Sequence, residues 1–105
     1  MTVIEASDSY AYTTRIANDD LFLAYFTASW CGPCKMMAPK VDELSTSYPD
    51  VDFLKIDIDR QHEVAQMAMV TAVPTFHLYK GGVKVGEMVG ADPAKLKQLL
   101  ETNSQ

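Results

Sequence analysis

The stretch FTASWCGPCK, residues 26–35, contains the only two cysteines of the chain, Cys31 and Cys34. A continuous apolar run, Leu21–Phe26, leads into it and predicts a buried central strand. A helical spacing of apolar residues follows and predicts a helix from about Cys31 to Tyr48. The cysteine pair therefore lies where a strand ends and a helix begins, a position where free N–H groups and partial positive charge stabilise a thiolate.

The spacing of the two cysteines is compatible with several kinds of chemistry. A structural zinc site needs four ligands, and the chain adds only His62 and His77, without the tight spacing of a histidine pair. A purely structural disulfide would close a loop so short that it would remove little entropy from the unfolded chain. The residues therefore favour thiol–disulfide exchange, and no metal site is expected.

Position within the pair predicts different roles for the two thiols. Cys31, at the helix N-terminus and turned toward solvent, is expected to attack, whereas Cys34, deeper in the first turn, is expected to resolve the mixed disulfide. Gly32 is expected to allow the close turn, and Pro33 suits a first helical turn, where a missing N–H costs nothing. Trp30 is expected to form a rim beside an exposed sulfur, with a half-buried core aromatic as the alternative.

Length and composition predict a single domain over residues 1–105. The 105 residues, 48% of them hydrophobic, suffice for one globular core. A formal net charge of −5 argues against nucleic acid as a partner. The chain shows no signal-peptide pattern and no apolar run of membrane-spanning length, so we expect a cytoplasmic protein without membrane contact. A cleaved transit peptide would leave no trace, so an organellar mature form is also compatible with the sequence.

The rest of the pattern predicts an α/β fold with element order βαβαβαββα. Besides the strand and helix around the cysteines, we expect strands at residues 2–6, 51–59, 76–80 and 83–89, and helices at about 8–18, 61–69 and 93–101. Helices between the early strands predict parallel pairing, and Gly81-Gly82 predicts a final antiparallel hairpin. Asp92 is expected to cap the last helix, with fraying from Thr102 onward.

The segment Trp30-Cys31-Gly32-Pro33-Cys34-Lys35 resembles the active-site signature of the thioredoxin family, and the likeness extends from about residue 21 to the C-terminus. The resemblance implies the thioredoxin fold, with a mixed five-stranded sheet and four flanking helices. It implies a monomeric protein disulfide reductase with a redox-active Cys31–Cys34 disulfide that supports cell redox homeostasis.

The same resemblance implies partners. These are thioredoxin reductase and disulfide-containing clients such as peroxiredoxins, ribonucleotide reductase and methionine sulfoxide reductase. No cofactor is expected to bind the chain, which lacks a nucleotide-binding glycine motif. NADPH would act indirectly, through the reductase.

Val73-Pro74-Thr75 resembles the cis-proline segment of the family. Pro74 is therefore expected to be cis and to face the cysteine pair, although a trans turn would be the ordinary case for the residues alone. The Val73 backbone would then pair with an extended client segment. The resemblance implies a shallow apolar docking surface for clients and reductase, with simple packing as the alternative for its two alanines, made of Trp30, Gly32, Pro33, Ala72, Val73, Pro74, Gly90 and Ala91.

One position departs from the family pattern. Most thioredoxins carry a buried aspartate six residues before the first cysteine, thought to help move the proton of the resolving thiol; here the residue is Tyr25. Tyrosine is a poor base near neutral pH, because its unperturbed pKa is about 10. We expect a more stable fold and a slower or rerouted deprotonation of Cys34, through water or Lys55, with an inert core aromatic as the alternative. Asp57 and Asp59 match acidic positions of the family, and the sequence does not show which way they point.

Two other functions are compatible with the motif. One is a dedicated donor, oxidase or isomerase; Gly32-Pro33 without a histidine between the cysteines favours a reductant by family comparison, and a reduction potential would separate these roles. The other is a binding subunit that uses the fold as a docking platform. Full activity of a Cys31→Ser, Cys34→Ser double variant would favour that role.

Overall fold

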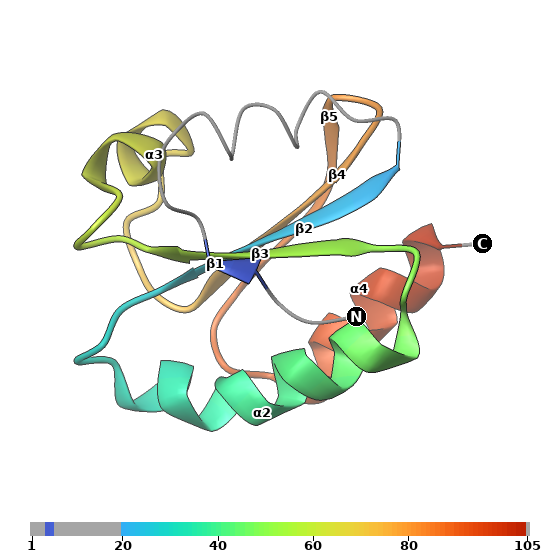
Figure 1. The fold of residues 1–105 in the computed structure, drawn as a ribbon, viewed down its shortest axis with the longest axis horizontal. Coiled ribbons are helices and arrows are strands. Elements are labelled where there is room, and N and C mark those ends of the chain that lie inside the picture. Colours follow the sequence, from blue (N-terminus) through green and yellow to red (C-terminus); the bar gives the residue numbers. More distant parts are fainter. Residues whose placement is uncertain (1–3, 6–19, 105) are drawn as a thin grey trace.

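The described part of the chain is a five-stranded sheet with helices packed on both of its faces (Figure 1). A computed structural model describes residues 4–5 and 20–104, the first two by their backbone alone. Its elements are β1 (Ile4–Glu5), β2 (Leu21–Thr27), α2 (Gly32–Ser47), β3 (Asp52–Asp57), α3 (His62–Met67), β4 (Thr75–Lys80), β5 (Val83–Val89) and α4 (Pro93–Asn103). The predicted helix at about residues 8–18 lies outside the described residues.

The sheet is mixed and has the strand order β1-β3-β2-β4-β5. β3 runs parallel to β1 and β2, whereas β4 runs antiparallel to β2 and β5. The predicted parallel first half and antiparallel final hairpin are therefore confirmed. Gly81 and Gly82 form the hairpin turn with φ of +59° and +82°, values that glycine adopts without a steric penalty.

The alternating side chains of β2 divide the core into two layers. Leu23 and Tyr25 belong to the layer packed under α2 and α4, which also contains Met37, Val41, Leu96 and Leu100. Phe22 and Phe26 belong to the layer on the other face, together with Leu54 and Ile56 of β3 and Val64 of α3. Figure 1 shows α2 and α4 on one side of the sheet and α3 on the other. β2 is central and covered on both faces, as its continuous apolar sequence predicts.

Two predicted boundaries near α3 are wrong by a few residues. β3 ends at Asp57 rather than residue 59, because the Asp57 carbonyl accepts the N–H groups of Arg60 and Gln61, at 3.1 and 2.8 Å, and turns the chain. α3 ends at Met67 rather than residue 69. Met69 has a φ of +57°, a left-handed conformation that commonly follows the last helical residue.

The two ends of α4 depend on side-chain caps. The predicted N-cap is confirmed, since the Asp92 carboxylate accepts the N–H of Lys95 at 3.1 Å and Pro93 opens the helix. The predicted fraying from Thr102 is wrong, because the helix continues to Asn103. The hydroxyl and the backbone N–H of Ser104 donate to the Leu100 carbonyl at 2.7 and 3.0 Å, and these bonds satisfy one of the terminal carbonyls.

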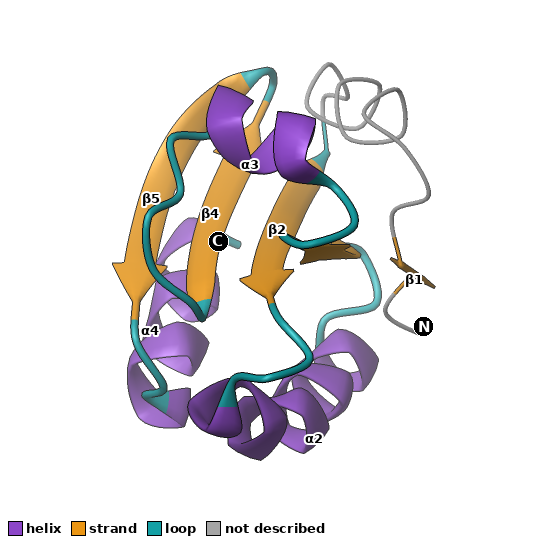
Figure 2. Cartoon of the chain, turned by 90° about the vertical axis from the view of Figure 1, so that its left-hand side faces the viewer, coloured by secondary structure: helices purple, strands orange, loops and turns teal. Residues whose placement is uncertain are grey.

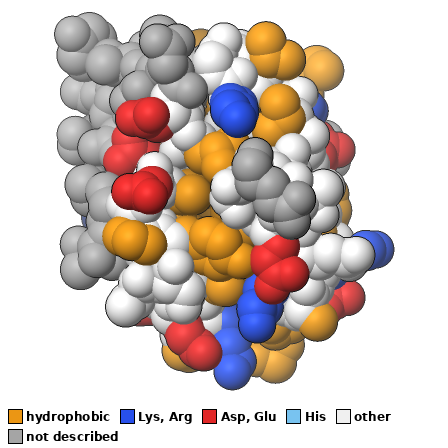
Figure 3. Space-filling view, turned by 90° about the vertical axis from the view of Figure 1, so that its right-hand side faces the viewer, with side chains coloured by type: hydrophobic (Ala, Val, Ile, Leu, Met, Phe, Trp, Pro, Cys, Tyr) orange, Lys and Arg blue, Asp and Glu red, His pale blue; other side chains and the backbone are white. Residues whose placement is uncertain are grey.

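The two ends of the molecule differ in what they present. Figure 2 shows the end where β2 leads into α2 and where the loop before β4 approaches the same point. Figure 3 shows the opposite end, where acidic and basic side chains surround a central hydrophobic area. Among the residues described, no helix has the length and apolar character needed to cross a membrane.

His77 of β4 is a buried titratable group in the sheet. Its Nε2 lies 3.2 Å from Oε1 of Glu87, which also accepts a hydrogen bond from Lys84 Nζ at 2.7 Å. The imidazole contacts the rings of Phe26 and Tyr79 in edge-on geometry. Burial first, and the charge of Lys84 second, lower the pKa of His77, and Glu87 opposes them in part.

Stability is therefore expected to depend on pH through His77. Because the pKa of His77 is depressed in the folded protein, the unfolded chain binds this proton more readily. The contribution of neutral His77 to the free energy of unfolding is therefore complete above the unfolded pKa of about 6.5. It is lost as the pH falls from there toward the folded pKa. Urea unfolding between about pH 7.5 and about pH 5 should show this decline, and His77→Gln should flatten it. An equal decline in both proteins would contradict the assignment.

Candidate active site

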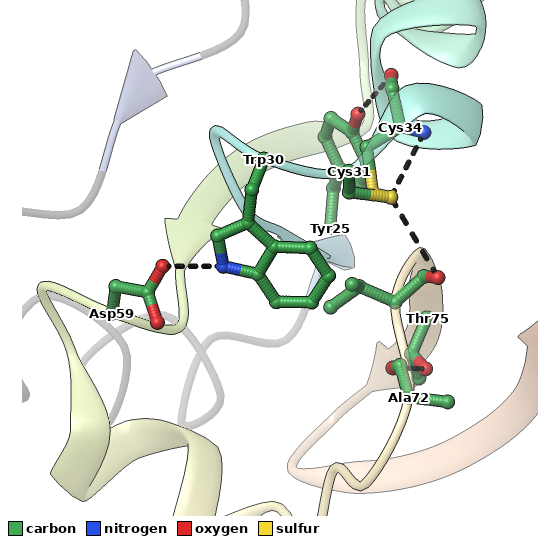
Figure 4. The surroundings of a disulfide bond; sticks show 8 residues. Tyr25, Trp30, Cys31, Cys34, Asp59, Ala72 and Thr75 are labelled. Carbon is green, nitrogen blue, oxygen red and sulfur yellow. Dashed lines mark hydrogen bonds between the residues drawn. A yellow bond between two sulfur atoms is a disulfide. The ribbon is translucent and has the colours of Figure 1, made fainter.

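The cysteine pair forms the start of α2 (Figure 4). Cys31 is the N-cap residue, and Cys34 lies in the first turn behind Pro33. The two cysteines are joined in a disulfide, with their Cα atoms 5.2 Å apart. The backbone N–H of Cys34 donates to Sγ of Cys31 at 3.1 Å, so the sulfur takes the place that a side-chain oxygen occupies in most helix caps.

The electrostatic setting of Cys31 favours negative charge on its sulfur after reduction. The first turn of α2 contains no acidic residue, and Lys35 stands in it. The partial positive charge of the helix N-terminus is therefore not offset within that turn. A donated N–H and a helix N-terminus both stabilise the thiolate relative to the thiol.

The predicted contrast in exposure between the two cysteines is wrong for the disulfide form. Cys31 is 4% exposed and Cys34 is 2% exposed. Together with Ala28 they form a small apolar cluster that Ile58 and Val73 cover in part. Sγ of Cys31 lies 3.8 Å from the Val73 carbonyl oxygen, a van der Waals contact because a disulfide sulfur carries no proton. Position in the helix, rather than burial, therefore distinguishes the two cysteines.

The wall opposite the sulfurs is the loop that enters β4. The Val73-Pro74 peptide bond is cis, which confirms the prediction. Thr75 Oγ1 donates to the Ala72 carbonyl at 2.6 Å and closes the turn around this bond. The Pro74 carbonyl accepts the N–H of Gly90 at 2.9 Å, and Gly90 has a φ of +111°, which a side chain would make costly. Two loops are thus tied together beside the disulfide.

Trp30 lies on the surface next to the disulfide and is 65% exposed, so the alternative of a half-buried core aromatic is wrong. Its indole Nε1–H donates to Oδ2 of Asp59 at 2.8 Å. Figure 4 shows the ring between Asp59 and the cysteine pair. Asp59 is therefore engaged in orienting an exposed aromatic ring.

Tyr25, at the position of the family's aspartate, is buried beneath α2. Its hydroxyl donates to the Cys34 carbonyl at 3.0 Å, and its ring stacks on Phe76 with centroids 5.0 Å apart. Burial raises the pKa of Tyr25; the charge of Asp42 raises it further, and a hydrogen bond with Thr27 opposes both. Tyr25 is therefore a hydrogen-bond donor to the helix that carries the cysteines, and it keeps its proton near neutral pH.

A hollow of about 240 Å³ lies between the sheet and the first turns of α2, and Cys34 is part of its lining. Lys55 and Asp57 of β3 line it from the sheet, since they are the register partners of Tyr25 and Thr27 on β2. The structure therefore brings Lys55 near Tyr25 and Cys34. It also separates the two acidic residues, because Asp57 faces the hollow whereas Asp59 faces Trp30.

The predicted need for glycine at Gly32 is not met by the structure. Its backbone is outside the left-handed region, and a Cβ at this position would meet nothing within 4 Å, so the turn itself does not require glycine. The residue instead leaves open space beside the disulfide.

Ala91, also predicted at the site, packs in part against the core under α4. In the parts of the chain described, no group of three or more metal-ligating side chains is present.

Sequence reasoning missed two residues of the site. Thr75 closes the loop around the cis bond, and the only signal was a hydroxyl residue directly after proline, a common turn pattern. Ile58 covers the disulfide from the turn after β3, and no local pattern indicated that contact.

A cysteine pair at a helix N-terminus that faces a cis-proline loop defines a site for thiol–disulfide exchange.

Comparisons with known proteins agree with this class. The thioredoxin family model matches residues 2–102. The chain is 45% identical over 101 residues to thioredoxin-1 of Schizosaccharomyces pombe, covering 96% of this chain and 98% of that protein. It is 52% identical over 80 residues to the mitochondrial thioredoxin O1 of Arabidopsis thaliana, covering 73% of this chain and 41% of that protein.

Solved structures give the same result. Plasmodium falciparum thioredoxin superposes with a TM-score of 0.92 at 37% identity, covering 96% of this chain and 99% of the other. A chain from a study of thiol resolution in yeast mitochondrial 1-Cys peroxiredoxin through the glutathione and thioredoxin systems superposes with a TM-score of 0.91 at 36% identity, covering 95% of this chain and 94% of the other. The chain belongs to the thioredoxin family. With its Cys31–Cys34 redox pair it is a dithiol protein disulfide reductase.

Removing the Tyr25 hydroxyl is expected to destabilise the fold. Tyr25→Phe keeps the ring stacking on Phe76 but leaves the Cys34 carbonyl without this donor, which should lower the free energy of unfolding by about 1 kcal/mol. Urea unfolding of the oxidised protein measures the loss. Tyr48→Phe, the same deletion at a partly exposed tyrosine after α2, is the matched control and should cost less. A Tyr25→Phe protein as stable as the wild type would show that the hydrogen bond contributes nothing net.

Proposed function

We propose that the Cys31 thiolate attacks the disulfide of a client protein and that Cys34 then releases the reduced client. In the first step a bond forms between Cys31 Sγ and one client sulfur, and the other client sulfur leaves with the electron pair. In the second step Cys34 Sγ attacks Cys31 Sγ, and the remaining client sulfur leaves. The client is reduced and the pair ends as the Cys31–Cys34 disulfide.

The observation that carries this assignment of roles is the hydrogen bond from the Cys34 N–H to Cys31 Sγ, at 3.1 Å. It supports a stabilised thiolate on Cys31 and on no other sulfur, because Cys34 lies inside the helix and its own N–H is the donor. The thiol that attacks the client must be ionised beforehand, whereas the resolving thiol, held in a preformed complex at high effective concentration, can lose its proton as it attacks.

We also propose that clients and the reductase dock on the surface around the disulfide. Exposed Trp30 and the open space at Gly32 support this docking surface. The Val73 carbonyl supports it too, because it lies against Cys31 Sγ. An extended client segment there could pair with the Val73 backbone. Pro74 is buried and would contribute mainly by shaping the loop. The remaining members of the proposed surface are Pro33, Ala72, Gly90 and Ala91.

The proposed cycle uses partners of the kinds that the family implies. Thioredoxin reductase would reduce the Cys31–Cys34 disulfide with electrons from NADPH. Peroxiredoxins are favoured among clients by the structural neighbour from a peroxiredoxin study, with ribonucleotide reductase and methionine sulfoxide reductase as further candidates. We propose a monomeric single domain over residues 1–105 that acts in the cytoplasm, and the similarity to a mitochondrial relative makes the mitochondrion the alternative to test.

The assignment predicts distinct failures for the two serine variants in an insulin-reduction assay with NADPH and thioredoxin reductase. Cys31→Ser should reduce the rate to that without protein, because the attacking sulfur is gone. Cys34→Ser should also stop turnover but should accumulate a covalent adduct between Cys31 and the client, visible by intact mass. An adduct on Cys34 in the Cys31→Ser protein, and none in Cys34→Ser, would reverse the roles. Full activity of the double variant would favour a docking platform.

A further inference from the structure

The chemistry of resolution requires that Cys34 lose a proton. Its sulfur attacks as a thiolate, yet its backbone N–H donates to Cys31, and the residue is 2% exposed. Burial in apolar surroundings disfavours the charged form of a thiol. A group that accepts this proton should therefore lie within reach of Cys34, either directly or through water.

The hollow beside Cys34 is the place to look for such a group. It has a volume of about 240 Å³ and lies between β2, β3 and the start of α2. A water molecule occupies about 30 Å³ in the liquid, so the hollow has room for several. Water in the hollow would connect Cys34 with the polar groups that line it, and would connect these groups with bulk solvent.

Four other titratable side chains line the hollow with Cys34, and three of them are unsuited to accept the proton. Tyr25, from β2, donates its hydroxyl hydrogen to the Cys34 carbonyl, and burial makes it a weaker acid still. Lys35, from α2, and Lys55, from β3, present ammonium groups, which donate hydrogen bonds and have no lone pair to accept one. Asp42 is not part of the lining, and it acts on Tyr25 only through its charge.

The fourth group is Asp57, the anion of this lining. Its Oδ1 accepts the N–H of Asp59 at 2.9 Å, a bond that fixes the carboxylate at the end of β3. A carboxylate has two oxygens and about four lone-pair positions, so this bond leaves capacity to accept a proton. Asp57 is partly exposed, which gives the proton a way out to solvent.

We propose that Asp57 accepts the proton of the Cys34 thiol, through water in the hollow, while Cys34 attacks the mixed disulfide. The proposal rests on the proposed roles of the two cysteines. The S–H bond of Cys34 breaks, a bond forms between the two Sγ atoms, and the bond from Cys31 to the client sulfur breaks. The leaving client sulfur keeps the electron pair and takes a proton from solvent, and Asp57 passes its proton to solvent through the hollow.

The two lysines assist in this arrangement. Lys35 and Lys55 place positive charge on the same hollow in which the Cys34 thiolate develops. A nearby opposite charge favours the charged form of a thiol, so the lysines lower the cost of the step that Asp57 completes. Lys55 is thus a positioning and electrostatic residue, whereas Asp57 is the proton acceptor.

The test separates attack by Cys31 from resolution by Cys34. Reduced protein is mixed with a nitrobenzoate disulfide, and the coloured nitrothiobenzoate is followed in a stopped-flow instrument. The first release reports attack by Cys31, and the second reports attack by Cys34 on the mixed disulfide. Asp57→Asn keeps an oxygen that can accept the Asp59 N–H and removes the basic carboxylate. Asp50→Asn, the same charge change in the exposed turn after α2, is the matched control.

Asp57→Asn should leave the first release unchanged and slow the second about a hundredfold near neutral pH, the lower end of what general acid–base catalysis contributes. The deficit should shrink as pH rises, because direct ionisation of Cys34 replaces the lost acceptor, and Asp57→Glu should restore part of the rate. Asp50→Asn should match the wild type in both releases.

Three results would overturn the proposal. These are an unchanged second release in Asp57→Asn at every pH, an equal slowing of both releases, or a deficit independent of pH. The Cys34→Ser protein, which should show one release only, keeps the two claims apart. A wild-type protein that also shows one release would refute the resolving role of Cys34 itself.

Discussion

The hydrogen bond from the Cys34 N–H to the Cys31 sulfur is the contact on which the rest of this site depends. It exists because the cap position of α2 is filled by a cysteine, and because the first helical N–H groups have no partner within the helix. Without it, the two buried sulfurs would be chemically similar. With it, the Cys31 sulfur is the one stabilised as a thiolate, so Cys31 is suited to attack and Cys34 to resolve.

The fold serves to keep that helix start in place. β2 is the central strand, so its C-terminal end is fixed by neighbours on both sides and by core layers on both faces. The hydroxyl of Tyr25 ties the first turn of α2 to this strand. On the other side of the disulfide, the cis-proline loop is held by Thr75 and by the N–H of Gly90. The reactive turn is therefore anchored to three elements far apart in the sequence.

Much of this architecture could be predicted from local patterns. The apolar run of β2, the glycine pair of the hairpin and the Asp92 cap each reflect physics that acts within a few residues. The cis bond before Pro74 required a family resemblance, because contacts distant in sequence determine the isomer. The burial of Cys31 escaped prediction for the same reason, since Val73, which covers it, lies 42 residues away. The direction of Asp57 could not be read either, because the pairing of β3 with β2, a contact distant in sequence, places it over the hollow.

Tyr25 donates a hydrogen bond to the backbone at the position where the family resemblance implies a buried carboxylate, so we propose that this site manages protons differently. The central claim, however, concerns Cys31. The most direct measurement is a pH titration of the reduced protein, following thiolate absorbance in the wild type and in Cys34→Ser and Cys31→Ser. The account predicts that Cys31 ionises at a clearly lower pH than a free cysteine thiol and that Cys34 ionises later. A Cys31 thiol that ionises no more readily than free cysteine, or later than Cys34, would contradict it.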